Sequence, residues 1–302
     1  MQAAASPPCV VCLGVATLDL VFRVAALPAP PAKVRALDFV VTGGGMAANA
    51  AVAVARLGGL ASYWGRLGDD EVGDQILRLL VQEGVDVRHV RRLAGARSKT
   101  AAVIVDEHGE RLVVSAPSQG YPPDPSWLPL HELDRVAAVH ADTRWVAGAE
   151  ALFRAAQARA LPSVFDGDSG SLEDVRRLSR AATHSFLSES MLAQFDPSPE
   201  AALRSLFGGV NRAVGATFGA RGVLWFDGER MQHMATPRVA VIDTLAAGDT
   251  WHGALALALA EGQPTLQAVR FATVAAALKC TRFGGRQGIP RRSEVERALI
   301  EL

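Results

Sequence analysis

Strand-like apolar runs are concentrated in the first 120 residues. They cover 9–14, 15–24, 33–41, 100–105 and 111–115, and the polar stretch 106–110 joins the last two as a hairpin turn. After residue 120 each strand is followed by a helix, at 136–141 with 148–160, at 163–166 with 171–181, and at 186–189 with a further helix. This alternation predicts a largely parallel sheet with helices on both faces. Strand ends of such a sheet face the functional site, which makes candidates of Asp142, Thr143, Arg144, Asp166 and Asp168.

The segment 241–260 reads as a strand, a tight turn and a helix. Its β-branched start leads into Ala246, Ala247 and Gly248, and an apolar helical run follows. Small residues let backbone N–H groups gather around an anion at the positive end of a helix. Asp249 in the first turn would stand beside that anion, where a carboxylate can take the proton of an alcohol. The segment predicts a phosphoryl-transfer site, although helix capping and packing would explain the same residues.

A second glycine-rich stretch, 42–49, precedes the alanine-rich helical run 50–57. Its glycines would again let the backbone approach a ligand closely. Gly43, Gly45 and Ala48 fit G-x-G-x-x-A, the dinucleotide fingerprint of dehydrogenases. That motif normally opens the first strand–helix unit, whereas strands precede it here. A dehydrogenase is therefore a remote alternative.

Composition narrows the class of protein. The 302 residues carry 31 acidic and 31 basic side chains, so nothing calls for nucleic acid or a membrane surface as partner. No apolar run approaches the length of roughly 20 residues that a membrane span requires. The start lacks the basic region of a signal peptide, and three cysteines suit a reducing compartment, so we expect a cytoplasmic protein. Cys9 and Cys12 would face opposite sides of a buried strand, which disfavours a metal or redox pair.

Four segments resemble motifs of one enzyme family. Residues 243–249, Asp-Thr-Leu-Ala-Ala-Gly-Asp, resemble the D-T-x-G-A-G-D signature of the ribokinase-like (PfkB) carbohydrate kinases, with Ala246 in place of a glycine. Residues 44–58 resemble the family's N-terminal signature, 62–73 resemble its strand followed by G-D-D-x-x-G, and 215–222 resemble its T-x-G-x-x-G segment. The family's N-x-x-E segment is only partly present at 188–191, so no metal ligand is assigned.

The resemblance implies a fold and a set of ligands. The expected fold is a ribokinase-like α/β domain spanning 1–302, with a central, mostly parallel sheet flanked by helices. A small β-sheet lid would come from about 15–43 and 98–118 and would mediate a homodimer. The expected ligands are a small-molecule sugar and ATP with Mg²⁺, and a monovalent cation is left open.

The resemblance also assigns site residues by position. Asp249 would be the catalytic base, and the turn formed by Ala246, Ala247 and Gly248 would hold the transferring phosphoryl group. The sugar would contact Asp19, Gly44, Gly45 and Asn49. The nucleotide would contact Thr217, Gly219, Gly222, Asp243 and Thr244.

Within the family, segments 141–145, 165–168, 248–254 and 276–290 look most like the bacterial 6-deoxy-6-sulfofructose kinases of sulfoglycolysis. The resemblance implies transfer of the γ-phosphoryl group of MgATP to the C1 hydroxyl of that sugar. Lys33 and Arg144 would hold the sulfonate, and Ser115 stands where relatives have an asparagine. Three readings stay open beside this one: that Lys33 and Arg144 are surface charges, that the substrate is a neutral ketose or other sugar, and that the chain is a non-catalytic sugar-binding regulator.

Overall fold

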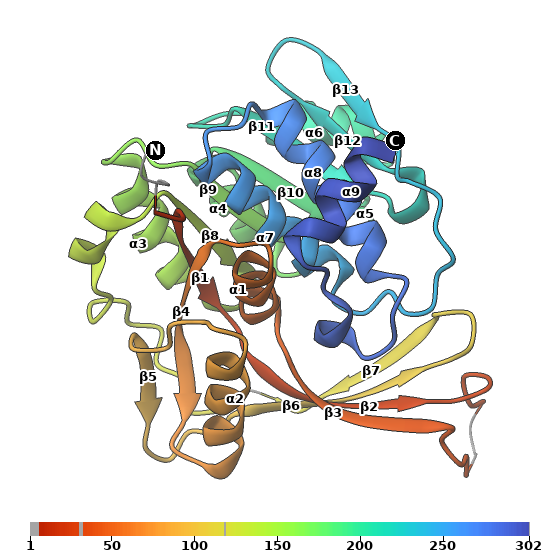
Figure 1. The fold of residues 1–302 in the computed structure, drawn as a ribbon. Coiled ribbons are helices and arrows are strands. Elements are labelled where there is room, and N and C mark those ends of the chain that lie inside the picture. The colour runs from red at the N-terminus through yellow and green to blue at the C-terminus, as the bar shows by residue number, and fades with distance from the viewer. Residues whose placement is uncertain (1–5, 30–32, 118, 302) are drawn as a thin grey trace, which may run out of the picture.

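A large sheet forms the centre of the molecule. The computed structural model describes residues 6–29, 33–117 and 119–301, and in this part of the chain the sheet has nine strands in the order β13-β12-β11-β10-β9-β8-β1-β4-β5 (Figure 1). The strands are β1 Cys9–Gly14, β4 Leu60–Gly68, β5 Val90–Leu93, β8 Ala138–Asp142, β9 Ser163–Gly167, β10 His184–Ser188, β11 Ala213–Thr217, β12 Val223–Phe226 and β13 Met231–Met234. All neighbours from β5 to β11 are parallel, and β12 and β13 add an antiparallel edge.

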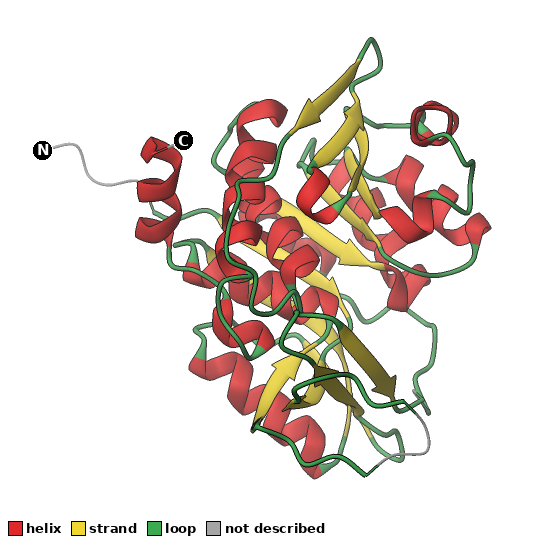
Figure 2. Cartoon of the chain, turned by 90° about the vertical axis from the view of Figure 1, so that its right-hand side faces the viewer, coloured by secondary structure: helices red, strands yellow, loops and turns green. Residues whose placement is uncertain are grey.

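Helices cover both faces of this sheet, as the alternating pattern predicts (Figure 2). One face carries α1 Met46–Arg56, α2 Glu71–Gln82, α7 Ala247–Ala260 and α8 Thr265–Lys279, and the other carries α3 Val146–Gln157, α4 Leu172–Ala181 and α6 Pro199–Leu206. Shorter or peripheral helices are α5 Glu189–Leu192, α9 Arg292–Glu301, η1 Leu130–Arg135, η2 Thr143–Trp145, η3 Gly219–Arg221 and η4 Gly285–Gly288. Strand β1 divides the core, because Val10 and Cys12 join one apolar cluster and Val11 and Leu13 the other.

A second, small sheet projects from this body in Figure 1. Its strands are β3 Asp38–Gly44, β2 Thr17–Arg23, β6 Lys99–Val105 and β7 Arg111–Ser115, in that order across the sheet. The predicted hairpin is confirmed, and the Asp106 carboxylate closes its turn by accepting the N–H groups of His108 and Glu110. The inner face of the sheet, including Val21 and Val103, packs toward Leu245 and Phe283. The small sheet is thereby anchored beside the start of α7.

Two expectations from the sequence need correction. The strand expected at 33–41 runs from Asp38 to Gly44, because β3 pairs in antiparallel register with β2 along its whole length and residues 33–37 precede that pairing. The G-x-G-x-x-A reading also fails, since β3 belongs to the small sheet and does not open a strand–helix unit of the parallel sheet. Among the described residues, no helix combines the length and apolarity needed to cross a membrane.

Candidate active site

The turn before α7 presents an open backbone surface. Ala246 adopts the left-handed conformation, with φ 65° and ψ 15°, and α7 begins at the next residue. Gly248 faces open space, because a Cβ added there would meet no atom within 4 Å. A helix N-terminus with free space above it favours an anion through its N–H groups and dipole. The turn therefore leaves room for an anion at these N–H groups, and phosphate binding there stays a prediction.

Asp249 stands in the first turn of α7 and is bound to a residue of α1. The Asn49 amide Nδ2 donates to Asp249 Oδ2 at 2.6 Å, which joins the two sequence motifs at one point. Burial and, after it, the nearby charge of Asp166 raise the pKa of Asp249 to about 7, although the Asn49 hydrogen bond acts in the opposite direction. A carboxylate whose pKa lies near neutrality can accept a proton from an alcohol.

Arg286, which the sequence analysis did not single out, lies at the centre of the site. Its Nε donates to Asn49 Oδ1 at 2.8 Å and its Nη2 donates to the Gly44 carbonyl oxygen at 3.1 Å. The side chain is 3% exposed, and its buried Nη1 has no hydrogen-bond partner among the described residues. A buried guanidinium with an unused donor indicates a ligand with an acceptor group. In the sequence, the glycine pair 284–285 directly before Arg286 was the feature that could have indicated a functional residue there.

Asp19 completes the cluster from β2. Its carboxylate accepts from Thr17 Oγ1 at 2.6 Å, and burial raises its pKa while Arg286 lowers it. The backbone at Gly44 passes so close that a Cβ would lie 1.9 Å from Asp19 Oδ2. Gly45, with φ 92°, then caps α1 and directs Asn49 inward. All four residues predicted to bind the sugar, Asp19, Gly44, Gly45 and Asn49, are therefore neighbours in space.

Buried polar groups behind α7 hold the turn in place. His252 Nδ1 lies 2.9 Å from the Gly248 carbonyl oxygen, and Nε2 lies 3.2 Å from that of Phe186. The same ring is 3.4 Å from Asp166 Oδ2. Asp142 accepts N–H groups from Val15 and Ala47, which ties the chain after β1 to the first turn of α1. His252 and Asp142 thus support the site by internal contacts.

The described contacts do not bring together the two basic residues that were predicted to bind an anionic group of the substrate. Arg144 is exposed in η2, next to Asp142, and borders a pocket of about 390 Å³ together with Arg66 and Trp145. Lys33 is exposed before β3, and the described contacts bring it to no other candidate. Lys99 of β6, which sequence reasoning missed, lies near Arg144, whose charge adds to burial in lowering the pKa of the lysine. Arg66 thus shares a pocket with Arg144, and Lys99 is a further cation close enough for the charge of Arg144 to act on it.

Ser115 faces the same side of the small sheet as Asp19. In the register of that sheet, Asp19 pairs with Ala101 and Ala101 pairs with Ser115, which puts the three side chains in one row. Lys99 lies two residues before Ala101 and shares this face. Ser115 is exposed, as is the rest of β7.

The residues predicted to bind the nucleotide fall into two groups. Gly219 has φ 57° and faces open space after β11, where Thr217 ends the strand, whereas Gly222 lies against the Met234 carbonyl oxygen. Asp243 is fully buried and its carboxylate accepts N–H groups from Leu245 and from residues 284–285. Thr244 Oγ1 accepts from Arg111 Nη1 and donates to the Gly109 carbonyl oxygen. Asp243 thus stabilises the turn through its contact with Leu245, and Thr244 links the turn to the hairpin of the small sheet.

Residues 6–29, 33–117 and 119–301 contain no group of three or more His, Cys, Asp or Glu side chains arranged to hold a metal ion. Glu189, the acid retained from the N-x-x-E segment, is paired with Arg221. Asp166 and Asp168 are close enough to Asp249 for both charges to raise its pKa. Mg²⁺ binds through one or two carboxylates together with phosphate oxygens and water, so an ion that arrives with a nucleotide needs few protein ligands.

Comparison with known proteins gives a consistent assignment. Residues 8–292 match the pfkB family carbohydrate kinases. A ribokinase of Lactococcus lactis is 26% identical over 294 residues, covering 96% of both chains. A solved structure from Agrobacterium tumefaciens with a provisional ribokinase assignment is 37% identical, has a TM-score of 0.89 and covers 98% of each chain. A fructokinase structure from Xylella fastidiosa with bound ATP is 25% identical, has a TM-score of 0.82, and covers 97% of this chain and 98% of its own. The protein has the ribokinase-like fold and belongs to the pfkB family of carbohydrate kinases.

Proposed function

We propose that this sugar kinase transfers the γ-phosphoryl group of MgATP to the C1 hydroxyl of 6-deoxy-6-sulfofructose. The observation that carries the phosphoryl-transfer part is the contact between Asn49 and Asp249 beside the open turn at Gly248. The substrate part depends on Lys99, which pairs with Thr17 two residues before Asp19 in β2, and on Arg144, whose charge acts on Lys99.

In this proposal Asp249 accepts the hydroxyl proton as the sugar oxygen attacks the γ-phosphorus. The N–H groups of residues 246–249 stabilise the charge on the transferring group, an effect that is large when the donors are already in place. Asp19, Asn49 and Arg286 orient the sugar hydroxyls through the hydrogen bonds described above. Bound Mg²⁺ would neutralise charge on the nucleotide phosphates. The two glycine turns, at 44–45 and 246–248, let backbone and ligands approach closely.

Lysine usage supports an anionic substrate. The chain contains only three lysines, Lys33, Lys99 and Lys279, against 28 arginines. Arginine thus supplies nearly all of the positive charge, so a lysine on the inner face of the small sheet points to a specific need for a compact ammonium group. A sulfonate presents three acceptor oxygens, which Lys99 and Arg144 could share with Ser115 as a neutral donor. Lys33 remains a predicted contributor on the resemblance alone.

The experiment is a coupled ADP-release assay with MgATP that compares sulfofructose, fructose, fructose 6-phosphate and ribose. We expect sulfofructose to have the highest kcat/KM, and Lys99→Met and Arg144→Ala to lower it by about 10–100-fold each, with little effect on fructose. Arg154→Ala, at an exposed position of α3, is the matched control and should leave all four values unchanged. If a neutral sugar has the highest kcat/KM and Arg144→Ala changes nothing, the assignment as a sugar kinase stands, but the proposed anion pocket is refuted.

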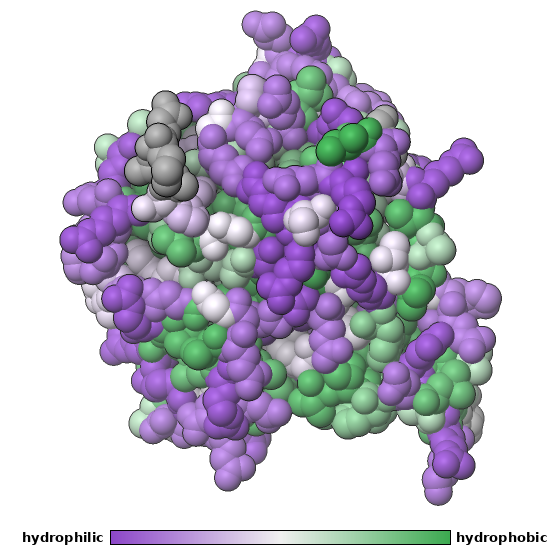
Figure 3. Space-filling model, viewed as in Figure 1, coloured by the Kyte–Doolittle hydropathy of each residue, from purple (hydrophilic) through white to green (hydrophobic). Residues whose placement is uncertain are grey.

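The small sheet is proposed to act as a lid and as a dimer surface. Its outer face exposes the apolar side chains of Leu37, Phe39, Leu112 and Val114, at 60%, 49%, 45% and 61%. Figure 3 shows apolar residues gathered over this part of the molecule. Apolar strand faces of this kind are commonly covered by a partner. Light scattering should give a dimer, and Phe39→Asp should give a monomer; a monomeric parent protein would refute the proposal.

A further inference from the structure

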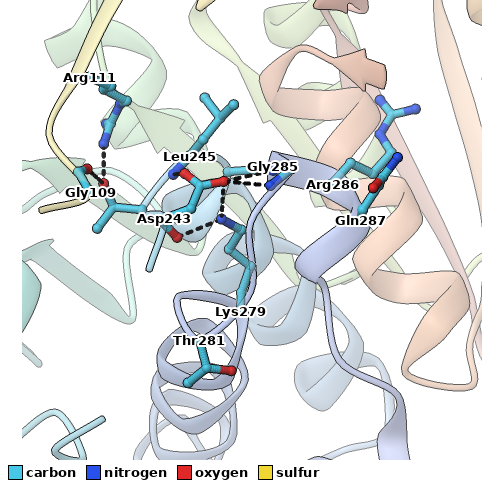
Figure 4. Close-up of polar contacts among 12 residues, drawn as sticks. Gly109, Arg111, Asp243, Leu245, Lys279, Thr281, Gly285, Arg286 and Gln287 are labelled. Carbon is cyan, nitrogen blue, oxygen red and sulfur yellow. Dashed lines mark hydrogen bonds and ion pairs between the residues drawn. The ribbon is translucent and has the colours of Figure 1, made fainter. Parts of the chain in front are cut away.

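A buried lysine ammonium lies beneath the turn that precedes α7. Lys279, at the end of α8, is fully buried, and its Nζ lies 2.7 Å from the Asp243 carbonyl oxygen and 3.4 Å from Asp243 Oδ2 (Figure 4). The Asp243 carboxylate also accepts the N–H groups of Leu245, Gly284 and Gly285 at 2.8–3.0 Å. The Lys279 ammonium group balances the negative charge of the Asp243 carboxylate, and both groups are shielded from water.

This ion pair connects the two segments that build the site. Leu245, held by Asp243 Oδ1, is the residue directly before the left-handed Ala246 of the phosphate-binding turn. Gly284 and Gly285, held by Oδ2, lead into η4 and so position Arg286 against Asn49. Loss of the positive charge would leave a buried carboxylate without its counter-ion at the junction of both segments. The charge on Lys279 therefore influences the turn and Arg286 together.

The oxygens around Nζ are the kind that bind a monovalent metal cation. A carbonyl oxygen and a carboxylate oxygen suit a hard cation, and an ammonium group is close to a potassium ion in size and charge. The sequence left a monovalent-cation cofactor open, but at this position the residues do not fit a free ion, because Nζ already occupies the space between the oxygens. We propose that Lys279 is a built-in replacement for a monovalent cation, and that this kinase works without added potassium, sodium or ammonium.

Lysine, rather than arginine, is required for this role. The chain uses arginine at 28 of its 31 basic positions, yet a lysine occupies the fully buried one beneath the turn. A planar guanidinium is larger than an ammonium and spreads its donors along a fork, whereas three donors on one nitrogen can point at oxygens around a single point. The inference concerns the kinase turn and goes beyond the proposed substrate, since it holds for any acceptor sugar.

The first test uses the unmodified protein in a Tris-buffered MgATP assay, with whichever sugar gives the highest turnover. We expect kcat/KM to change less than about twofold when potassium chloride replaces tetramethylammonium chloride at equal ionic strength. Activation of several-fold by potassium would overturn the inference, because it would mean that a free cation still has a site. This outcome is separate from the sugar preference, so the proposed substrate can fail while the cation inference stands.

The second test changes the lysine itself. Lys279→Met keeps the volume but removes the charge, and should lower kcat/KM on the order of 10–100-fold with no recovery in potassium. Lys279→Ala opens space, and should recover activity in potassium or ammonium chloride but not in tetramethylammonium chloride. Arg270→Met, on an exposed face of the same helix, is the control and should behave as the parent. Parent-like turnover of Lys279→Met without added ions would refute the role.

A binding readout independent of activity completes the test. The thermal unfolding midpoint of Lys279→Ala should rise with potassium concentration, because an ion that binds only the folded state stabilises it. The midpoints of the parent protein and of Lys279→Met should not respond beyond the effect of tetramethylammonium chloride. An equal potassium response in all three proteins would locate ion binding elsewhere and contradict the inference.

Discussion

The most direct prediction concerns the pH dependence of turnover. If Asp249 is the base, only its ionised form is active, and its pKa of about 7 places the inflection of kcat/KM near neutrality. Activity should then be about half of its plateau at pH 7 and should fall about tenfold for each pH unit below that. The pKa of Asp249 is raised because burial disfavours the charged carboxylate, and because the nearby negative charge of Asp166 disfavours it further.

Changing Asp166 separates this titration from that of the nucleotide. Asp166→Asn keeps the shape of the side chain but removes the nearby negative charge, so the pKa of Asp249 should fall and the inflection should move to lower pH. At pH 6 the variant should therefore retain a larger fraction of its own plateau than the parent does. The assay is the coupled ADP-release reaction at saturating MgATP and constant ionic strength, with the plateau of each protein as its own reference.

Two controls test the reasoning. Asp134→Asn removes an exposed carboxylate whose partner is Arg159, and should not move the inflection. Asp249→Asn should lower kcat by about 10²–10⁴-fold at every pH, because the base is absent. A flat profile between about pH 5.5 and 8, or an inflection that stays in place in Asp166→Asn, would show that Asp249 is not a base whose pKa Asp166 raises.

Three further predictions follow from the geometry of the site. Ala246→Gly should raise the free energy of unfolding by roughly 0.5–1 kcal/mol in urea denaturation, because the left-handed conformation strains alanine. Ala160→Gly, at φ 54°, should have the same effect away from the site. A loss of stability in both variants would contradict this prediction. Asn49→Ala should raise the inflection pH of kcat/KM, since the hydrogen bond that stabilises the Asp249 carboxylate is lost; an unchanged inflection would argue against that bond. Gly44→Ala should raise the sugar KM by about tenfold or more, with little change in the ATP KM, because its Cβ would displace the Asp19 carboxylate; equal changes in both would point to general misfolding.

Local pattern was sufficient for the architecture and for the two motifs. Strand–helix alternation after residue 120 predicts the parallel sheet, because periodicity and turn residues act over short distances. The hairpin at 100–115 and the turn at 246–249 can likewise be predicted from the sequence, since each depends on residues that are neighbours along the chain. The boundaries of β3 were wrong in the sequence analysis because that strand is defined by its pairing with β2, a contact that local pattern does not contain.

Only the tertiary structure decided which charged side chains serve the site. Arg286 meets Asn49 across 237 residues of chain, and Lys279 meets Asp243 across 36. In the sequence both look like the charges that normally remain in solvent. Their burial results from the packing of α7 and α8 against the sheet, which brings separate segments together and excludes water from between them. The sequence by itself determined the fold class and the motif residues, whereas the partners of those residues depend on long-range packing that no local rule specifies.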